Sequence, residues 1–180
     1  MTIDTQGLEA IIKKVMDTID FAEETGRPLT DGKDGIFEDI DDAIAAAAKA
    51  QKEYMKLPMA TRTKIIDAIR KELGKKENIE TICSKVVEET GMGDYDCKLI
   101  KQKLVVDKTP GVEDLVTEAF TGDDGLTLVE LSPFGVIGAI TPTTNPNETI
   151  ICNSIGMLAA GNTVVFSPHP RSIESSLITV

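Results

Sequence analysis

The sequence is short of basic residues, histidine and paired cysteines. It contains no tryptophan, one histidine and three cysteines in 180 residues, and its formal net charge is -11. The acidic balance argues against nucleic acid as a partner, because phosphate binding requires clustered lysines and arginines. The single His169 has no cysteine near it in sequence, so we expect no metal site. Cys83, Cys97 and Cys152 are widely spaced and odd in number, which is typical of reduced thiols rather than a disulfide framework.

Long apolar runs are missing as well. No stretch approaches the roughly 20 apolar residues that a membrane-spanning helix needs. The N-terminus is polar and acidic, unlike a secretory signal, which is basic and then apolar. We therefore expect a cytoplasmic protein without nucleic-acid or membrane partners. A hydrophobic fraction of 41% is ordinary for a domain of this length with its own core.

The first 25 residues predict an amphipathic helix that is separate from the rest of the chain. One narrow apolar stripe repeats at helical spacing through Leu8, Ile11, Ile12, Val15, Met16 and Ile19. Residues 26–36 are rich in glycine, proline and charge, which is typical of a linker. We interpret residues 1–25 as a targeting-type helix that needs a partner to bury its stripe. The alternative is an ordinary N-terminal helix that packs on the core.

Residues 37–180 predict a helical part followed by strands. We expect helices over 37–56, 59–74, 78–90 and 94–107, and a short one over 111–119. Strands follow over 125–131, 135–141 and 162–167. The strand over 135–141 is almost wholly apolar, as a parallel strand covered on both faces is, and 162–167 repeats this pattern around Val164, Val165 and Phe166. A helix over 146–160 joins the two strands. The fold class is α/β: a helical part that leads into the first βαβ unit of a Rossmann-like parallel sheet.

The helix over 146–160 has legible ends. Asn145 stands at the N-cap, Pro146 at the first position and Glu148 at the third, a variant of the capping box, while Gly161 follows the last turn. Polar turns follow both parallel strands, where open α/β sheets bind ligands. A further helix begins at Ser172. A single βαβ unit cannot cover both faces of its own strands, so we expect the front part of a larger, incomplete fold; why the chain ends at residue 180 stays open.

Three segments carry a resemblance to known proteins: Ser132-Pro-Phe-Gly-Val-Ile-Gly-Ala-Ile-Thr-Pro-Thr-Thr-Asn-Pro146, Ser167-Pro-His-Pro-Arg171 and Val87-Glu-Glu-Thr-Gly-Met-Gly93. They resemble the coenzyme-A-acylating aldehyde dehydrogenases of the aldehyde dehydrogenase superfamily. The resemblance covers roughly residues 37–180. The N-terminal helix with its linker is similar to the encapsulation segments of family members that work inside bacterial microcompartments. The resemblance thus implies a cytoplasmic enzyme that could be enclosed in such a shell, with a shell protein as partner.

The resemblance also implies a reaction. A cysteine thiolate adds to a short-chain aldehyde, NAD accepts a hydride, and coenzyme A removes the acyl group from the resulting thioester. The family's cysteine and its acid/base glutamate lie beyond residue 180, in a catalytic domain that this sequence does not contain. We therefore expect the 180-residue chain to be inactive alone, and the parent protein to be a homo-oligomer. The length of the aldehyde cannot be read from these residues.

The resemblance assigns roles to the two polar turns. Asn145 would donate its side-chain N–H to the oxyanion; Thr144 is the runner-up, because aligning the prolines with the broader superfamily places its asparagine there. Capping alone would also explain Asn145. The positions that would flank the nicotinamide ribose are Thr141, Pro142 and Thr143. The positions that would lie at the adenosine ribose are Ser167, Pro168, His169 and Pro170.

The second turn departs from the wider superfamily, which has Lys-Pro-x-Glu there. Neither the lysine nor the glutamate is present, so NADP is not excluded. The same pocket would serve NAD and coenzyme A in turn. His169 is a ribose or phosphate contact or a plain turn residue. Cys152 lies two turns into an apolar helix without a charged neighbour, which favours a buried structural cysteine over a nucleophile.

Two further functions remain open. The chain could act as a non-catalytic piece whose own activity is docking to a shell protein through residues 1–25. It could also belong to a bifunctional aldehyde-alcohol dehydrogenase, which shares the two turns but usually lacks a detached N-terminal helix.

Overall fold

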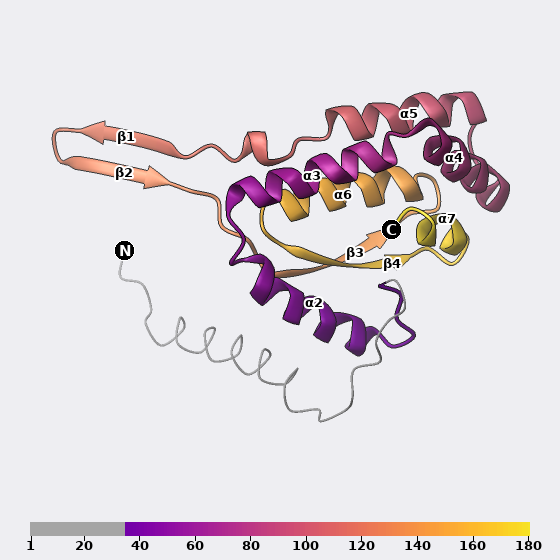
Figure 1. Cartoon of the computed structure of the whole chain (residues 1–180), viewed down its shortest axis with the longest axis horizontal. Coiled ribbons are helices and arrows are strands. Elements are labelled where there is room, and N and C mark those ends of the chain that lie inside the picture. The colour runs from indigo at the N-terminus through magenta and orange to yellow at the C-terminus, as the bar shows by residue number, and fades with distance from the viewer. Residues whose placement is uncertain (1–34) are drawn as a thin grey trace. The chain divides into compact units, whose positions relative to one another are not determined.

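The computed structural model describes residues 35–180 (Figure 1). The helix expected over 1–25 and nearly all of the linker expected over 26–36 lie outside these residues. Residues 46–180 form one compact unit. No helix in the described range is long and apolar enough to cross a membrane.

Helices come first, as predicted. They are Ile40–Tyr54 (α2), Met59–Leu73 (α3), Lys76–Thr90 (α4) and Tyr95–Lys108 (α5), followed by a short 3-10 helix at Val112–Asp114 (η1). The strands and remaining helices are Glu118–Gly122 (β1), Gly125–Val129 (β2), Val136–Thr141 (β3), Pro146–Ala159 (α6), Thr163–Pro168 (β4) and Ile173–Leu177 (α7). The predicted α/β order of a helical part leading into strands is confirmed.

The hydrophobic core fixes α6 against α3 and α5. Ile151, Ile155 and Ala159 lie four residues apart on one face of α6, and they pack with Ile66 of α3 and Val106 of α5. Each of these side chains is at most 2% exposed. Burying an isoleucine side chain stabilises a fold by about 1.5–3 kcal/mol. The core therefore anchors the helix whose first turn carries the candidate site.

The strands β3 and β4 run parallel and are joined by α6. Val136 pairs with Thr163 at one end and Thr141 with Pro168 at the other. This confirms the predicted βαβ unit, and it brings the carboxyl ends of both strands to the same end of the sheet. Within the described residues only one face of β3 is covered, because Ala139 is 6% exposed and Ile140 is 86% exposed. A single βαβ unit is expected to leave one face open in this way.

An antiparallel hairpin replaces the helix expected over 111–119. Only Val112–Asp114 is helical, and β1 pairs with β2 from Glu118 and Val129 to Gly122 and Gly125. Phe120 and Thr121 favour a strand, and the two glycines flank a two-residue turn, a combination that the helical reading overlooked. Both strands are exposed along their length, and the hairpin projects from the rest of the 46–180 unit (Figure 1).

The end of α6 depends on one glycine, as predicted. Gly161 has a φ of +86°, in the left-handed region, and its N–H donates to the Leu158 carbonyl at 3.0 Å. A Cβ at this position would lie 2.7 Å from a guanidinium nitrogen of Arg62 on α3. That guanidinium sits over the Tyr54 ring at 5.5 Å from its centroid, so moving it would disturb a second contact. The turn after α6 therefore favours glycine.

We expect Gly161→Ala to lower the free energy of unfolding by about 1–2 kcal/mol, because alanine is strained at positive φ. The matched control is Gly156→Ala, within α6, where a Cβ would meet nothing within 4 Å. That change should be neutral or stabilise by up to about 1 kcal/mol through helix propensity. Urea denaturation of the two variants measures both effects; equal stability of Gly161→Ala and wild type would contradict the turn described above.

Candidate functional site

The turn between β3 and α6 contains buried polar atoms without partners. Thr141, at the end of β3, is 1% exposed, and its hydroxyl has no hydrogen-bond partner among residues 35–180. The hydroxyl of Thr143 is buried and unpaired in the same way. Pro142 between them is exposed. An unpaired buried hydroxyl can donate to and accept from a ligand, so the predicted cofactor contacts lie together and are chemically suited to a polar group.

A buried lysine holds this turn from α5. Lys98 is 4% exposed, and its Nζ donates to the carbonyl oxygen of Thr144 at 2.8 Å. The Lys98 side chain packs against Gly93, where a Cβ would lie 3.0 Å from the Lys98 Cε. The glycine that ends the 87–93 segment therefore makes room for the lysine that fixes the turn.

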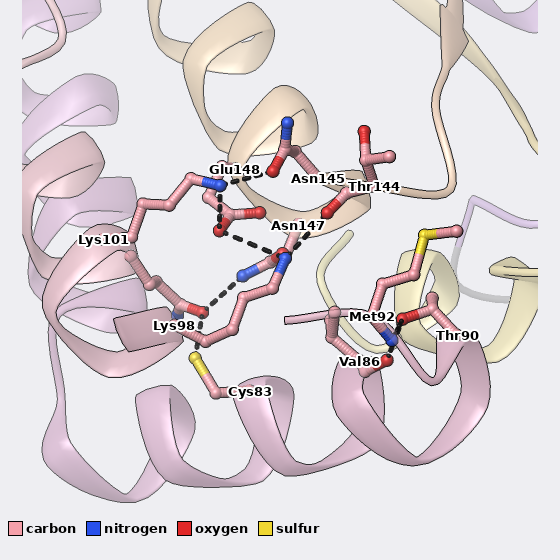
Figure 2. Close-up of polar contacts among 11 residues, drawn as sticks. Cys83, Val86, Thr90, Met92, Lys98, Lys101, Thr144, Asn145, Asn147 and Glu148 are labelled. Carbon is pink, nitrogen blue, oxygen red and sulfur yellow. Dashed lines mark hydrogen bonds and ion pairs between the residues drawn. The ribbon is translucent and has the colours of Figure 1, made fainter. Parts of the chain in front are cut away.

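The Asn145 side chain does not cap α6. Asn145 stands at the N-cap with φ -142° and ψ 55°, but its side chain makes no hydrogen bond to the first turn of the helix. Its Oδ1 accepts instead from the Nζ of Lys101 on α5. Figure 2 shows the amide oxygen facing Lys101 and the amide nitrogen turned away. The capping interpretation of Asn145 is therefore wrong, because a charged donor occupies the oxygen that would cap.

Glu148 is drawn into the same cluster. It is 4% exposed, and its Oε1 lies 3.3 Å from the Nζ of Lys101 and 3.7 Å from that of Lys98. The expected capping box is wrong, because these two ammonium groups attract the carboxylate away from the backbone at the N-cap. We call Lys98, Lys101 and Glu148 the lysine–glutamate cluster. A buried carboxylate between two ammonium groups is compensated in charge, which its burial requires.

Polar contacts continue behind the cluster. The Nδ2 of Asn147 donates to the Oε1 of Gln102 at 2.9 Å, and the thiol of Cys83 donates to the same oxygen at 3.4 Å (Figure 2). All three side chains are 0% exposed. Burial first and the Glu148 carboxylate second raise the pKa of the Cys83 thiol to about 11, against the opposing effect of Lys98. The start of α6 is thus held by hydrogen bonds and charge in addition to the burial of Pro146.

Sequence reasoning missed these residues because α5 has an inverted pattern. Lys98 and Gln102 are buried together with Val106 at a spacing of four residues, whereas Ile100 and Leu104 are 71% and 56% exposed. An apolar stripe normally faces the core. The signal available in the sequence was the spacing itself: a lysine, a glutamine and a valine on one helical face, directly after the 87–93 segment.

The second polar turn, after β4, is tied to the end of α4. The Nδ1 of His169 accepts from the backbone N–H of Arg171 at 3.1 Å, so the ring supports its own turn. Glu89 accepts from the backbone N–H groups of Glu174 and Ser175 at 2.9 and 2.8 Å. Burial opposes ionisation of Glu89, but the Ser175 and Glu174 hydrogen bonds lower its pKa overall. The Arg171 guanidinium also donates to the Thr90 carbonyl at 3.5 Å, so two of the three resembling segments meet here.

The remaining members of the second turn differ in exposure. Ser167 and Pro170 are exposed, and Pro168 and His169 are half-buried. The two predicted groups of cofactor contacts follow neighbouring parallel strands at the same end of the sheet.

The cysteines differ from expectation at one position. Cys152 is exposed, so the prediction of a buried structural cysteine is wrong, because no described element covers that flank of α6. Cys97 is exposed too, and its hydrogen bond with Asp94 raises its pKa. Within residues 35–180 no group of histidine, cysteine and acidic side chains could hold a metal ion.

Comparisons with known proteins agree with the resemblance. The profile described as "Aldehyde dehydrogenase family" matches residues 11–180. A CoA-propanoylating propanal dehydrogenase of Citrobacter freundii is 44% identical over 99% of this chain, which covers 38% of that relative. The chain therefore spans a little over a third of the length of the curated relatives it matches.

Two solved structures extend the comparison. Rhodopseudomonas palustris propionaldehyde dehydrogenase, with bound CoA and an acylated cysteine, shares 59% identity and a TM-score of 0.79; the match covers 82% of this chain and 34% of that one. An engineered glycolyl-CoA reductase with bound NADP+ shares 57% identity and a TM-score of 0.80, covering 83% and 34%. These matches confirm that the fold is the N-terminal part of that of acylating aldehyde dehydrogenases.

Cys83 should resist alkylation by iodoacetamide at pH 8 in the folded chain, because its raised pKa and complete burial leave almost no accessible thiolate. Exposed Cys152 should react, and urea should make Cys83 react as well.

The same raised pKa predicts a pH-dependent stability. Since the pKa of Cys83 in the folded chain lies above the ordinary value of 9.0, the stability contribution of the protonated thiol is fully present below pH 9 and is lost as pH rises through about 11. Peptide mass spectrometry measures the labelling, and urea melts of wild type and Cys83→Ala measure the pH dependence. Equal labelling of Cys83 and Cys152 at pH 8 would contradict this assignment.

Proposed function

The chain belongs to the aldehyde dehydrogenase family, and we propose that it is the cofactor-binding front part of a coenzyme-A-acylating enzyme. In this proposal the whole protein oxidises a short-chain aldehyde to an acyl-CoA through a cysteine thioester. The cysteine belongs to a part of the protein beyond this chain. Support comes from the 44% identity to a CoA-propanoylating relative, which extends over 99% of the chain.

The observation that carries the proposal is the orientation of the Asn145 amide. Its oxygen is occupied by Lys101, and its Nδ2 has no acceptor among the described residues. The amide is half-buried at the N-terminus of α6, where the helix dipole also favours negative charge. Asn145 would donate this N–H to the oxyanion that forms when a thiolate adds to an aldehyde. Thr144 remains the alternative donor through its exposed hydroxyl, since its carbonyl already accepts from Lys98.

The cofactor of the proposed reaction is NAD, which accepts the hydride when bound. The unpaired hydroxyls of Thr141 and Thr143 would contact its nicotinamide ribose, with Pro142 shaping the turn. The turn Ser167-Pro-His-Pro170 would receive the adenosine ribose of NAD, or that of coenzyme A in the later half of the reaction. NADP stays an alternative, because this turn carries no acidic side chain to reject a 2′-phosphate.

The N-terminal segment suggests a second candidate activity. The apolar stripe of residues 1–25 would dock to a microcompartment shell protein, placing the enzyme inside such a compartment; this rests on the sequence pattern and the resemblance alone. The parent protein would be a homo-oligomer. The exposed apolar side chains of the hairpin, Phe120, Leu126 and Leu128, support an assembly of several copies. A bifunctional aldehyde-alcohol dehydrogenase remains the less favoured form of the parent.

The 180-residue chain alone should not oxidise aldehydes. Cys83 is buried with a raised pKa, Cys97 also has a raised pKa, and Cys152 has no charged side chain paired with it among the described residues. The assay is NADH formation from propionaldehyde with NAD and coenzyme A, using a protein of the relatives' full length as the positive control. Activity of the short chain that disappears in Cys152→Ala would overturn the proposal.

Asn145→Asp tests the oxyanion role in that full-length protein. Aspartate keeps an oxygen for Lys101 but has no N–H, and it places a negative charge beside the developing anion. We expect kcat to fall by roughly 100-fold or more for both Asn145→Asp and Asn145→Ala, the range seen when an oxyanion donor is removed. Steady-state kinetics of acyl-CoA formation provide the measurement, with Thr144→Val as the comparison. A fast Asn145→Asp enzyme would refute the assignment and favour Thr144 or backbone donors.

A further inference from the structure

We propose that Lys101 is a positioning residue that acts through Asn145: its ammonium holds the amide oxygen and so turns the amide N–H toward the reacting oxygen. The inference rests on the proposed function, which supplies the role of Asn145. It adds a residue from a different helix, α5, whose spacing from the polar turn in sequence gives no hint of such a role.

The first step is chemical. A lysine ammonium carries three donors and no acceptor, so only the oxygen of an amide can face it. Lys101 therefore decides which end of the Asn145 amide points into the cluster and which end points out (Figure 2). An asparagine at an N-cap would otherwise turn its oxygen to the backbone N–H groups of the helix, and this contact is absent.

The second step concerns what holds Lys101 itself. Its Nζ lies 3.3 Å from the Oε1 of Glu148, which is buried on α6 one helical turn beyond Asn145. Lys98 approaches the same oxygen at 3.7 Å and fixes the Thr144 carbonyl. The ammonium of Lys101 is therefore placed by a carboxylate that is itself fixed, and the flexible lysine stem has one preferred end point.

The third step is electrostatic. A cation on the carbonyl oxygen of an amide polarises the group and makes its N–H hydrogens more positive, because hydrogen-bonded groups in series strengthen one another. The cluster has two positive charges and one negative charge, so its net charge favours an anion nearby. Both effects strengthen donation from the Asn145 Nδ2 as negative charge develops on the substrate oxygen.

Lys101 is the member of the cluster that can be tested cleanly. The Lys98 side chain is 5% exposed, and removing it would leave the Thr144 carbonyl without its donor and take one of two ammonium groups away from the buried Glu148 carboxylate. The Lys101 side chain is 44% exposed, and Lys98 continues to pair with Glu148 when Lys101 is changed. Lys101→Met retains the apolar stem and loses the donor, and Lys101→Arg keeps the charge.

The test uses the full-length protein and measures acyl-CoA formation from propionaldehyde. We expect Lys101→Met to lower kcat by about 10-fold or more with KM for the aldehyde little changed, the pattern of a lost transition-state interaction. Lys101→Arg should recover most of kcat. Lys103→Met is the matched control, because Lys103 lies on the same helix, is 69% exposed and pairs with Asp107. It should behave as wild type.

The double variant separates positioning from stability. If Lys101 acts through Asn145, adding Lys101→Met to Asn145→Ala should slow the enzyme by less than about 2-fold further, since residues that act as a unit are not additive. Full additivity, or a Lys101→Met enzyme with wild-type kcat, would overturn the inference. An inactive wild type would instead defeat the proposed function.

Crystal structures of the variants test the inference independently of catalytic activity. In wild type the Asn145 oxygen should face Lys101; in Lys101→Met the amide should rotate to the N-cap or take several orientations, while Lys103→Met leaves it in place. An Asn145 amide that keeps its orientation in Lys101→Met would show that Lys101 does not set it.

Discussion

One buried carboxylate governs the arrangement of the candidate site. Glu148, in the first turn of α6, lies between Lys98 and Lys101 of α5. A buried charge is tolerated when it is paired, so α5 must turn polar side chains inward and leave Ile100 and Leu104 outside. The same two lysines then reach the Thr144 carbonyl and the Asn145 amide. The lysine–glutamate cluster thus connects the packing of two helices to the orientation of one catalytic candidate.

The apolar core and the lysine–glutamate cluster act on different parts of α6. Ile151, Ile155 and Ala159 fix the middle and end of the helix against α3 and α5 without specifying any polar geometry. The cluster, with Asn147 and Gln102 behind it, fixes the first turn. Apolar packing is non-directional, whereas hydrogen bonds prefer defined distances and angles. Apolar burial therefore fixes the position of α6, and charge and hydrogen bonds fix the orientation of the side chains in its first turn.

Periodicity and local turn chemistry predicted most of the fold. The helices, the parallel β3–α6–β4 unit and the glycine after α6 follow from patterns within single elements. The errors arose where distant residues decide. The Asn145 cap and the Glu148 capping box looked correct locally, but lysines more than 40 residues earlier compete for both side chains. The exposure of Cys152 likewise depends on which elements lie beside α6.

Only part of the candidate site could be predicted from the sequence, because residues far apart in the chain form it. The polar turns 141–145 and 167–171 could be located because they follow apolar strands. Lys98 and Lys101 could not, since a lysine on a helix is usually solvated. Their role appears when α5 is packed beside α6, because Gly93 leaves room for the Lys98 stem and Glu148 supplies the opposing charge.

The most direct test is a crystal structure of the full-length protein carrying the acyl group of its substrate on the reactive cysteine. The account predicts that the Nδ2 of Asn145 points at the thioester oxygen within hydrogen-bond distance, ready to approach to about 2.7–3.1 Å when that oxygen becomes an oxyanion. Its Oδ1 should stay on the ammonium of Lys101. A thioester oxygen bound by Thr144 or by backbone N–H groups alone, with the Asn145 amide turned elsewhere, would contradict it.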